Sequence, residues 1–122
     1  MVSTGPTTYH QFWPYYLREH GRGLTRTLHY VGSTIAILSV IAAIVTLNPW
    51  FLLGAVIGGY LFAWIGHFFV EKNRPATFRY PLWSLVSDFR MYFMWLAGRL
   101  DAELKRCHAE ENESEAVAAE AA

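Results

Sequence analysis

Two long apolar runs dominate the chain, and a single turn signal separates them. Residues 30–70 contain no Lys, Arg, Asp or Glu, and Asn48-Pro49 divides this stretch into runs of 18 and 21 residues. A helix needs about 20 apolar residues to cross the hydrocarbon core of a bilayer, and Asn-Pro favours a turn. The pattern therefore predicts a transmembrane hairpin with helices at about 30–47 and 50–70.

The segments outside the hairpin predict further helices and a tail. Residues 81–100 combine an aromatic-rich surface with a polar face that includes Asp88, so this helix either lies in the membrane interface or packs against the hairpin as a third membrane helix. The N-terminal stretch TYHQFWPYYLREHGRG is typical of an interfacial helix. We therefore predict an all-α integral membrane protein, with one domain over 1–106 and a disordered Ala/Glu-rich acidic tail over 107–122.

Composition supports a membrane protein. Apolar residues make up 53% of the 122 residues and charged residues 16%, whereas soluble chains average about 25% charged. The formal net charge is zero, which provides no basic field for binding nucleic acid. Small residues on both apolar runs predict that the two helices pack closely. They are Gly54, Gly58 and Gly59 on the second run, and Ser33, Ser39 and Ala42 or Ala43 on the first.

Basic residues flank the hairpin on both sides and are absent from its turn. By the positive-inside rule, both ends of the hairpin face the cytoplasm, in a bacterial inner membrane or, in a eukaryote, the endoplasmic reticulum. The flanking residues are Arg18, Arg22, Arg26, Lys72, Arg74 and Arg79.

Counting outward from the turn places two histidines at the same depth. His29 lies 19 residues before position 48 and His67 lies 18 residues after position 49, so with a rise of about 1.5 Å per residue their rings are level. His67 and Glu71 share a helix face as i and i+4, and glycines after His20 allow the chain to bend back over the hairpin. Because imidazole is the commonest metal ligand among side chains, these residues predict a metal site at the cytoplasmic mouth.

Other interpretations of the same residues stay open at this point. Two level histidines on neighbouring helices are also typical of axial haem ligands, and a glycine-rich hairpin that scaffolds a partner needs no metal. Glu71 and Arg26 fall at one depth and could form a structural ion pair. Asp88 is an ionisable group in an apolar helix and is therefore a functional candidate.

Two segments resemble a known family. YYLREHGRGLTRTLHYVGS at 15–33 and GHFFVEKNRPATFRYPLWSLVSDFRMY at 66–92 resemble the 2-hydroxy fatty acid dioxygenase-like family, first catalogued as a domain of unknown function. The resemblance covers roughly residues 12–96. The fungal member of that family is an iron(II)-dependent enzyme that shortens 2-hydroxy fatty acids by one carbon. One position departs from the family pattern, because Thr25 stands where an asparagine is usual.

The resemblance implies a site, a cofactor and a reaction. It implies that three motif histidines bind Fe(II), leaving positions for a 2-hydroxy fatty acid and for dioxygen, and that the acyl tail lies along the apolar helices. Carboxylates near the site would orient the imidazoles or accept a proton. The implied partners are the fatty acid, dioxygen and membrane lipid, with homo-oligomerisation left open. The candidate residues are the metal ligands His20, His29 and His67, the catalytic Glu71 and Asp88, and the substrate-binding Arg26, Arg74 and Asn73.

Overall fold

The computed structural model describes residues 5–121, and over that range the chain forms helices and no strand. This confirms the predicted all-α class. The helices are α1 (Tyr9–Glu19), α2 (Gly23–Thr46), α3 (Trp50–Ile65), the π-helical segment η1 (Gly66–Glu71), the 3-10 turn η2 (Ala76–Phe78), α4 (Pro81–Leu96) and α5 (Leu100–Ala121).

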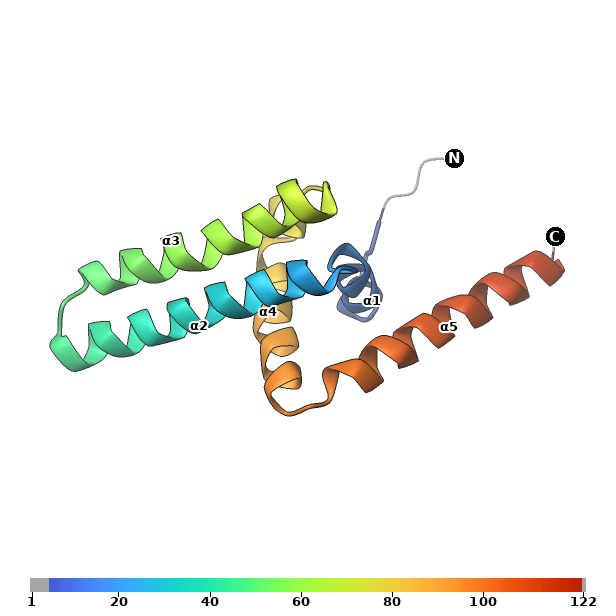
Figure 1. Cartoon of the computed structure of the whole chain (residues 1–122). Coiled ribbons are helices and arrows are strands. Elements are labelled where there is room, and N and C mark those ends of the chain that lie inside the picture. The colour runs from blue at the N-terminus through green and yellow to red at the C-terminus, as the bar shows by residue number, and fades with distance from the viewer. Residues whose placement is uncertain (1–4, 122) are drawn as a thin grey trace.

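The predicted hairpin consists of α2 and α3, which lie side by side in antiparallel orientation (Figure 1). Leu47 ends α2 in the left-handed conformation with φ 55°, and the side-chain oxygen of Asn48 accepts a 3.1 Å hydrogen bond from the backbone N–H of Trp50. The segments Gly23–Thr46 and Trp50–Glu71 are long and apolar enough to cross a membrane. The first of them begins well before the predicted start at residue 30.

Small residues allow the two hairpin helices to touch. A Cβ atom built on Gly32 would lie 2.9 Å from the carbonyl oxygen of Gly59, and one on Gly58 would lie 2.5 Å from Cγ2 of Ile35. Gly54 packs less tightly, since its Cβ would meet Oγ of Ser39 at 3.6 Å. The small residues predicted at this contact included Gly58 and Gly59 but not Gly32.

The helical geometry changes after α3 ends at Ile65. Gly66–Glu71 forms a π-helical turn, a geometry that is rare and often occurs at functional sites. Lys72 then ends the segment in the left-handed conformation with φ 59°. The backbone N–H of Asn73 donates to the carbonyl oxygen of His67 over 2.9 Å, which folds the following loop back over this turn.

Helix α4 crosses the hairpin on one side (Figure 1). Pro81 occupies its first turn, where a missing N–H costs nothing, and Gly98 at φ 70° turns the chain towards α5. The helix ends at Leu96, so it is shorter than the predicted 81–100, and it is not among the segments long enough to span a membrane. A mainly aromatic core fills the space between α1, α4 and α5, and it includes Phe12, Trp13, Tyr16, Met91, Tyr92 and Leu100.

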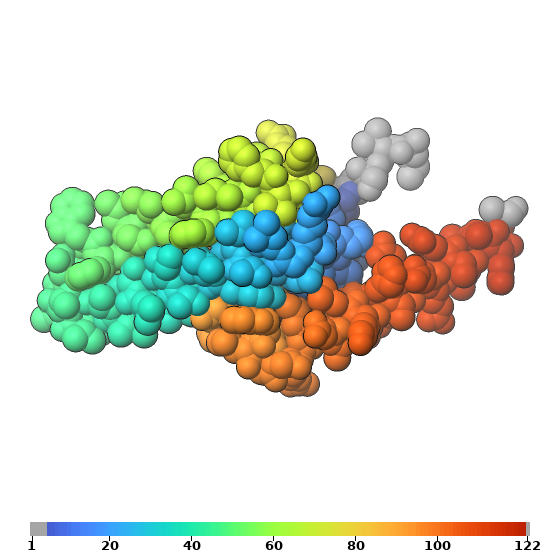
Figure 2. Space-filling view, viewed as in Figure 1, coloured from blue at the N-terminus to red at the C-terminus, as the bar shows by residue number. Residues whose placement is uncertain are grey.

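The C-terminal region differs from the disordered tail predicted for 107–122. Helix α5 continues to Ala121 and extends away from the hairpin (Figures 1 and 2). Its alanines and glutamates have high helix propensity. Arg18 of α1 pairs with Glu111 at 3.2 Å, and Arg106 pairs with Glu110 at 2.8 Å within the helix.

Candidate metal centre

Three histidines from three separate segments meet at the end of the hairpin opposite its turn. His20 follows α1, His29 lies in the second turn of α2, and His67 lies in η1. All three are buried, with exposed fractions of 1, 5 and 2%. The Nε2 atom of His20 lies 2.9 Å from Nε2 of His29 and 3.0 Å from Nε2 of His67. The three potential ligand atoms all fall within 4.8 Å of one another, as the sequence predicted for a metal site.

The partners of the opposite ring nitrogens fix the tautomer of each histidine. Nδ1 of His20 lies 2.7 Å from the carbonyl oxygen of Tyr16, and Nδ1 of His29 lies 3.0 Å from that of Thr25. Carbonyl oxygens can only accept hydrogen bonds, so both Nδ1 atoms carry the proton. Each of these neutral rings therefore turns the lone pair of its Nε2 atom towards the centre of the cluster.

Asn73 fixes the third ring in the same way. Its amide nitrogen donates to the backbone carbonyl of Glu19 at 3.2 Å and to the Glu19 carboxylate at 2.7 Å. That assignment leaves Oδ1 of Asn73 as an acceptor, and it lies 2.7 Å from Nδ1 of His67. The Nε2 atom of His67 thus also presents a lone pair to the cluster.

This arrangement fits a bound cation. Three lone pairs that face one another at hydrogen-bond distance, with no proton between them, repel unless a positive ion lies among them. Imidazole nitrogens bound to one ion at about 2.1 Å and at right angles lie about 3.0 Å apart. The separations from Nε2 of His20 to the other two Nε2 atoms are 2.9 and 3.0 Å. Axial haem ligands stand on opposite faces of a macrocycle, so rings this close do not support the haem alternative.

Burial keeps the His20 ring in the neutral form that can bind a metal. Desolvation, followed by the neighbouring rings of His29 and His67, lowers the pKa of His20 well below its usual range. The ring therefore stays neutral at physiological pH, which is the form that binds metals. Arg26 holds the bend that carries it, because its Nη1 donates to the carbonyl oxygens of His20 and Gly21 at 2.8 and 3.1 Å.

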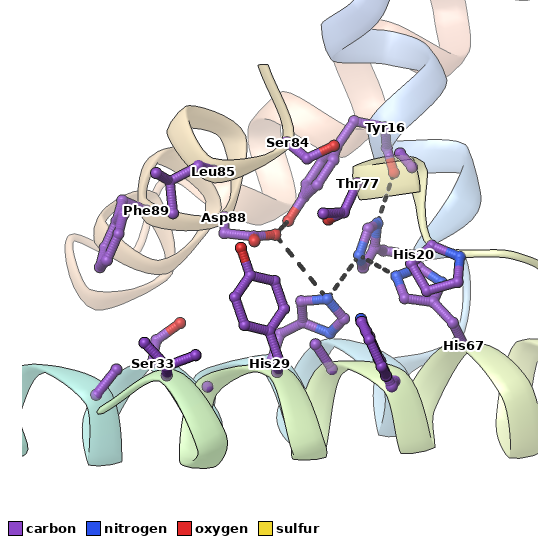
Figure 3. A pocket seen from close by; sticks show the side chains of 18 of the residues that line it. Tyr16, His20, His29, Ser33, His67, Thr77, Ser84, Leu85, Asp88 and Phe89 are labelled. Carbon is purple, nitrogen blue, oxygen red and sulfur yellow. Dashed lines mark hydrogen bonds and ion pairs between the residues drawn. The ribbon is translucent and has the colours of Figure 1, made fainter. Parts of the chain in front are cut away.

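The cluster closes one end of a mostly apolar cavity of about 220 Å³. The cavity runs from the histidines between the hairpin and α4 (Figure 3). Among the described residues that line it there is no Lys or Arg. Its walls include Ala36, Val40, Val56, Gly59, Ala63, Leu85 and Phe89.

Asp88 and Tyr16 form a polar pair beside the histidines (Figure 3). The Tyr16 hydroxyl donates a 2.5 Å hydrogen bond to Oδ1 of Asp88, and the same oxygen lies 3.9 Å from Nε2 of His29. Burial raises the pKa of Asp88 to about 7, an effect that the hydrogen bond from Tyr16 opposes. Burial and the adjacent Asp88 raise the pKa of Tyr16 well above its usual range, so the phenol remains a donor.

Three other predicted site residues, Glu71, Arg26 and Arg74, lie outside the histidine cluster and contact other parts of the chain. Oε1 of Glu71 accepts a 2.7 Å hydrogen bond from the backbone N–H of Arg22, and Oε2 lies 3.9 Å from the Arg22 side chain. Glu71 therefore caps the start of α2 and pairs with Arg22 rather than Arg26. Arg74 lies over the ring of Phe78, 6.0 Å from its centroid. Neither Arg26 nor Arg74 lines the cavity, so their substrate contacts stay a prediction.

Tyr16 was not among the predicted site residues, and the contacts that Asn73 makes in this site were not predicted. Tyr16 precedes His20 by four residues, so it provides the carbonyl that fixes His20 as well as the hydroxyl that holds Asp88. The i, i+4 spacing of these two residues was the available signal. Asn73 was predicted to bind substrate, which stays a prediction; in the structure it contacts His67 and Glu19. That contact depends on the π-helical turn and the loop after it, which periodicity does not reveal.

Fold and site together define an all-helical protein with a buried three-histidine centre at one end of an apolar cavity. A family model described as 2-hydroxy-palmitic acid dioxygenase Mpo1-like matches residues 6–100. The chain therefore belongs to the Mpo1-like family, in agreement with the resemblance seen in the sequence. Neither the curated proteins nor the solved structures that were searched gave a match.

Proposed function

We propose that this protein is a membrane-embedded Fe(II)-dependent dioxygenase that shortens 2-hydroxy fatty acids by one carbon. The observation that carries the proposal is the convergence of three buried Nε2 lone pairs, in which His20 lies from each of the other two at about the spacing that a single ion requires. The family description supports the reaction class. Bound at these histidines, Fe(II) would supply open coordination positions and the electrons needed to activate dioxygen.

The overall reaction balances without another reductant. A 2-hydroxy acid and one dioxygen give an acid one carbon shorter, one carbon dioxide and one water. The bond between C1 and C2 breaks, C2 is oxidised from an alcohol to a carboxyl group, and C1 leaves as carbon dioxide. These changes release four electrons, which reduce the dioxygen completely.

The chain's own residues would orient the substrate and exclude water. The apolar walls of the cavity suit an acyl chain, which would place the polar head at the histidines. Asp88 lies beside that head and could hold a proton at Oδ2, while its Oδ1 accepts the hydrogen bond from the Tyr16 hydroxyl. Glu71 and Asn73 would act by holding α2 and His67 in place.

A position in the membrane supports the same substrate class. The two candidate spans form the hairpin, whose outer surface exposes apolar side chains such as Leu38, Ile44 and Leu53. Under this proposal the hairpin spans the bilayer with its ends and the site on the cytoplasmic side. A lipid acid could then enter the cavity from the surrounding bilayer.

Metal content and product formation test this function. Detergent-purified protein loaded with Fe(II) should convert 2-hydroxypalmitate and oxygen into the C15 acid and an equal amount of carbon dioxide. His20→Ala, His29→Ala and His67→Ala should each lose the metal and the activity. His10→Ala and His108→Ala are matched controls, because both residues are exposed and lie outside the cluster.

Two results would contradict the proposal. Retention of the metal by all three cluster variants would remove the site from these histidines. A wild-type protein with iron bound that produces no shortened acid would remove the reaction.

A further inference from the structure

Ser84 is a buried hydroxyl in the cavity that has no hydrogen-bond partner in the described part of the chain. It lies on α4 with an exposed fraction of 2%, and its Oγ atom contacts no donor or acceptor there. It precedes Asp88 by one helical turn, and both residues line the cavity (Figure 3). Nearly all buried polar groups in proteins are hydrogen-bonded, so an unpartnered hydroxyl at a cavity wall indicates a group that arrives with a ligand.

The other deeply buried polar side chains that line the cavity already have partners. The Tyr16 hydroxyl donates to Asp88, and the Nδ1 atoms of the three histidines contact Tyr16, Thr25 and Asn73. A carboxylate in the cavity would also meet no Lys or Arg among the described lining residues. Such a carboxylate could bind a metal ion at the histidines. Among the deeply buried side chains of this wall, Ser84 has the hydroxyl that is free to donate a hydrogen bond to the carboxylate.

We propose that Ser84 is a substrate-binding residue whose hydroxyl donates a hydrogen bond to the carboxylate of a fatty acid bound in the cavity. The inference rests on the proposed function in one respect, namely that the cavity accepts a fatty acid. It assigns carboxylate recognition to α4 and not to Arg26 or Arg74. No bond is made or broken in this role.

Ser87 provides a matched control on the same helix. It is fully buried like Ser84, but its Oγ pairs with the hydroxyl of Tyr9 at 3.0 Å, and it does not line the cavity. Ser87→Ala therefore removes a buried α4 hydroxyl of the same kind without touching the proposed ligand contact. Ser84→Cys preserves the size of the side chain while replacing a strong donor with a weak one, which keeps the test valid if Ser84→Ala packs poorly.

Binding to protein loaded with Zn(II), which has no redox chemistry, separates recognition from turnover. Palmitate and 2-hydroxypalmitate would be titrated against wild type, Ser84→Ala, Ser84→Cys and Ser87→Ala, with tryptophan fluorescence as the readout, because Trp64 lines the cavity. We expect both Ser84 variants to weaken binding of both acids, by about tenfold for Ser84→Ala, and Ser87→Ala to stay within about twofold of wild type.

Each outcome decides the inference. Unchanged affinity in both Ser84 variants, an equal loss in Ser87→Ala, or a loss confined to 2-hydroxypalmitate would overturn it, the last because Ser84 would then contact the 2-hydroxyl group. Wild type that binds neither acid would also overturn it. If the acids bind in a Ser84-dependent way but the Fe(II) protein forms no shortened acid, the proposed reaction fails while Ser84 remains a carboxylate-binding residue.

Discussion

The Nδ1 atom of His67 lies 2.7 Å from Oδ1 of Asn73, and the amide nitrogen of Asn73 lies 2.7 Å from the carboxylate of Glu19. This chain of contacts joins η1 to the end of α1, the segment that precedes His20. Asn73 thus fixes the tautomer of one candidate ligand and ties it to the segment that carries another. Loss of such an outer contact typically lowers metal affinity or activity by about 10- to 100-fold.

Replacing Asn73 should weaken metal binding without removing a ligand. Asn73→Ala removes the acceptor at Nδ1 of His67, so the ring loses both its orientation and its preferred tautomer. We expect the affinity for Fe(II) or Co(II) to fall by about 10- to 100-fold. Competition with a chelator would measure this, with Arg74→Ala as the control in the same loop. Equal affinities in the two variants would contradict the role assigned to Asn73.

Removing the Tyr16 hydroxyl should free Asp88 to approach the metal. Oδ1 of Asp88 lies only 3.9 Å from Nε2 of His29, and the hydrogen bond from Tyr16 holds it in place. In Tyr16→Phe we expect the carboxylate to become a ligand, which would change the visible absorption of Co(II)-loaded protein. Adding Asp88→Asn should restore the wild-type spectrum.

Tyr92→Phe is the matched control for that experiment. The Tyr92 hydroxyl is also paired in the interior, with the hydroxyl of Thr34 at 2.8 Å, but Tyr92 does not line the cavity. Its Co(II) spectrum should equal that of wild type. A Tyr16→Phe spectrum that also matches wild type would show that Asp88 needs no restraint.

Much of the fold and of the metal cluster could be predicted, because both follow from the number of residues in each apolar run and between each histidine and the turn. The hairpin follows from the length of two apolar runs and one turn signal, and equal distances from the turn place His29 and His67 at one depth. His20 was placed by the glycines that follow it, which permit a bend but do not give its direction, and the resemblance named the same residue. Its position depends on Arg26, which binds the carbonyl oxygens of the bend.

The outer contacts of the site could not be predicted in the same way. Asn73 reaches His67 only because the helix widens to a π-turn and Lys72 adopts a positive φ, and neither change has a reliable sequence signal. Glu71 was placed near Arg26 by depth, but the actual partner is Arg22 at the start of α2. Counting residues from the turn gives the position of a residue along the helix axis, but it does not give the direction in which the side chain points around that axis.

Close packing of the hairpin should depend on Gly32 more than on Gly54. Gly32→Ala would place a Cβ atom 2.9 Å from the backbone oxygen of Gly59, which forces α2 and α3 apart. We expect a loss of about 1–3 kcal/mol in the free energy of unfolding, together with weaker metal binding, because the same helices carry His29 and lead to His67.

Gly54→Ala is the control for this packing prediction. Its Cβ atom would meet Oγ of Ser39 at an ordinary contact distance of 3.6 Å, and alanine favours a helix more than glycine does. Thermal unfolding in detergent should therefore give a midpoint equal to or above that of wild type. If both variants lose stability equally, the tight contact at Gly32 does not hold the hairpin together.

Glu103 joins three helices and should make the stability of the protein depend on pH in the acid range. On α5, its Oε2 atom accepts a 2.9 Å hydrogen bond from Nε1 of Trp13 in α1 and lies 3.5 Å from Arg90 of α4. Its Oε1 atom accepts a 2.6 Å bond from Arg106. These contacts, with the Arg106 hydrogen bond as the largest cause, hold the pKa of Glu103 below its ordinary value of 4.5.

The sign of the pH effect follows from that lowered pKa. The folded state favours the ionised carboxylate, so the stabilisation is complete above pH 4.5 and is lost as the pH falls through the lower pKa of the folded state.

Glu103→Gln should lower the free energy of unfolding by about 1–2 kcal/mol at neutral pH, because two charge-assisted hydrogen bonds are weakened. The difference in unfolding midpoint between this variant and wild type should then shrink as the pH is lowered from 6 towards about 3. Glu115→Gln, an exposed residue of α5, should follow wild type throughout. A constant difference between Glu103→Gln and wild type across this range would mean that the carboxylate's charge does not contribute to the junction of α1, α4 and α5.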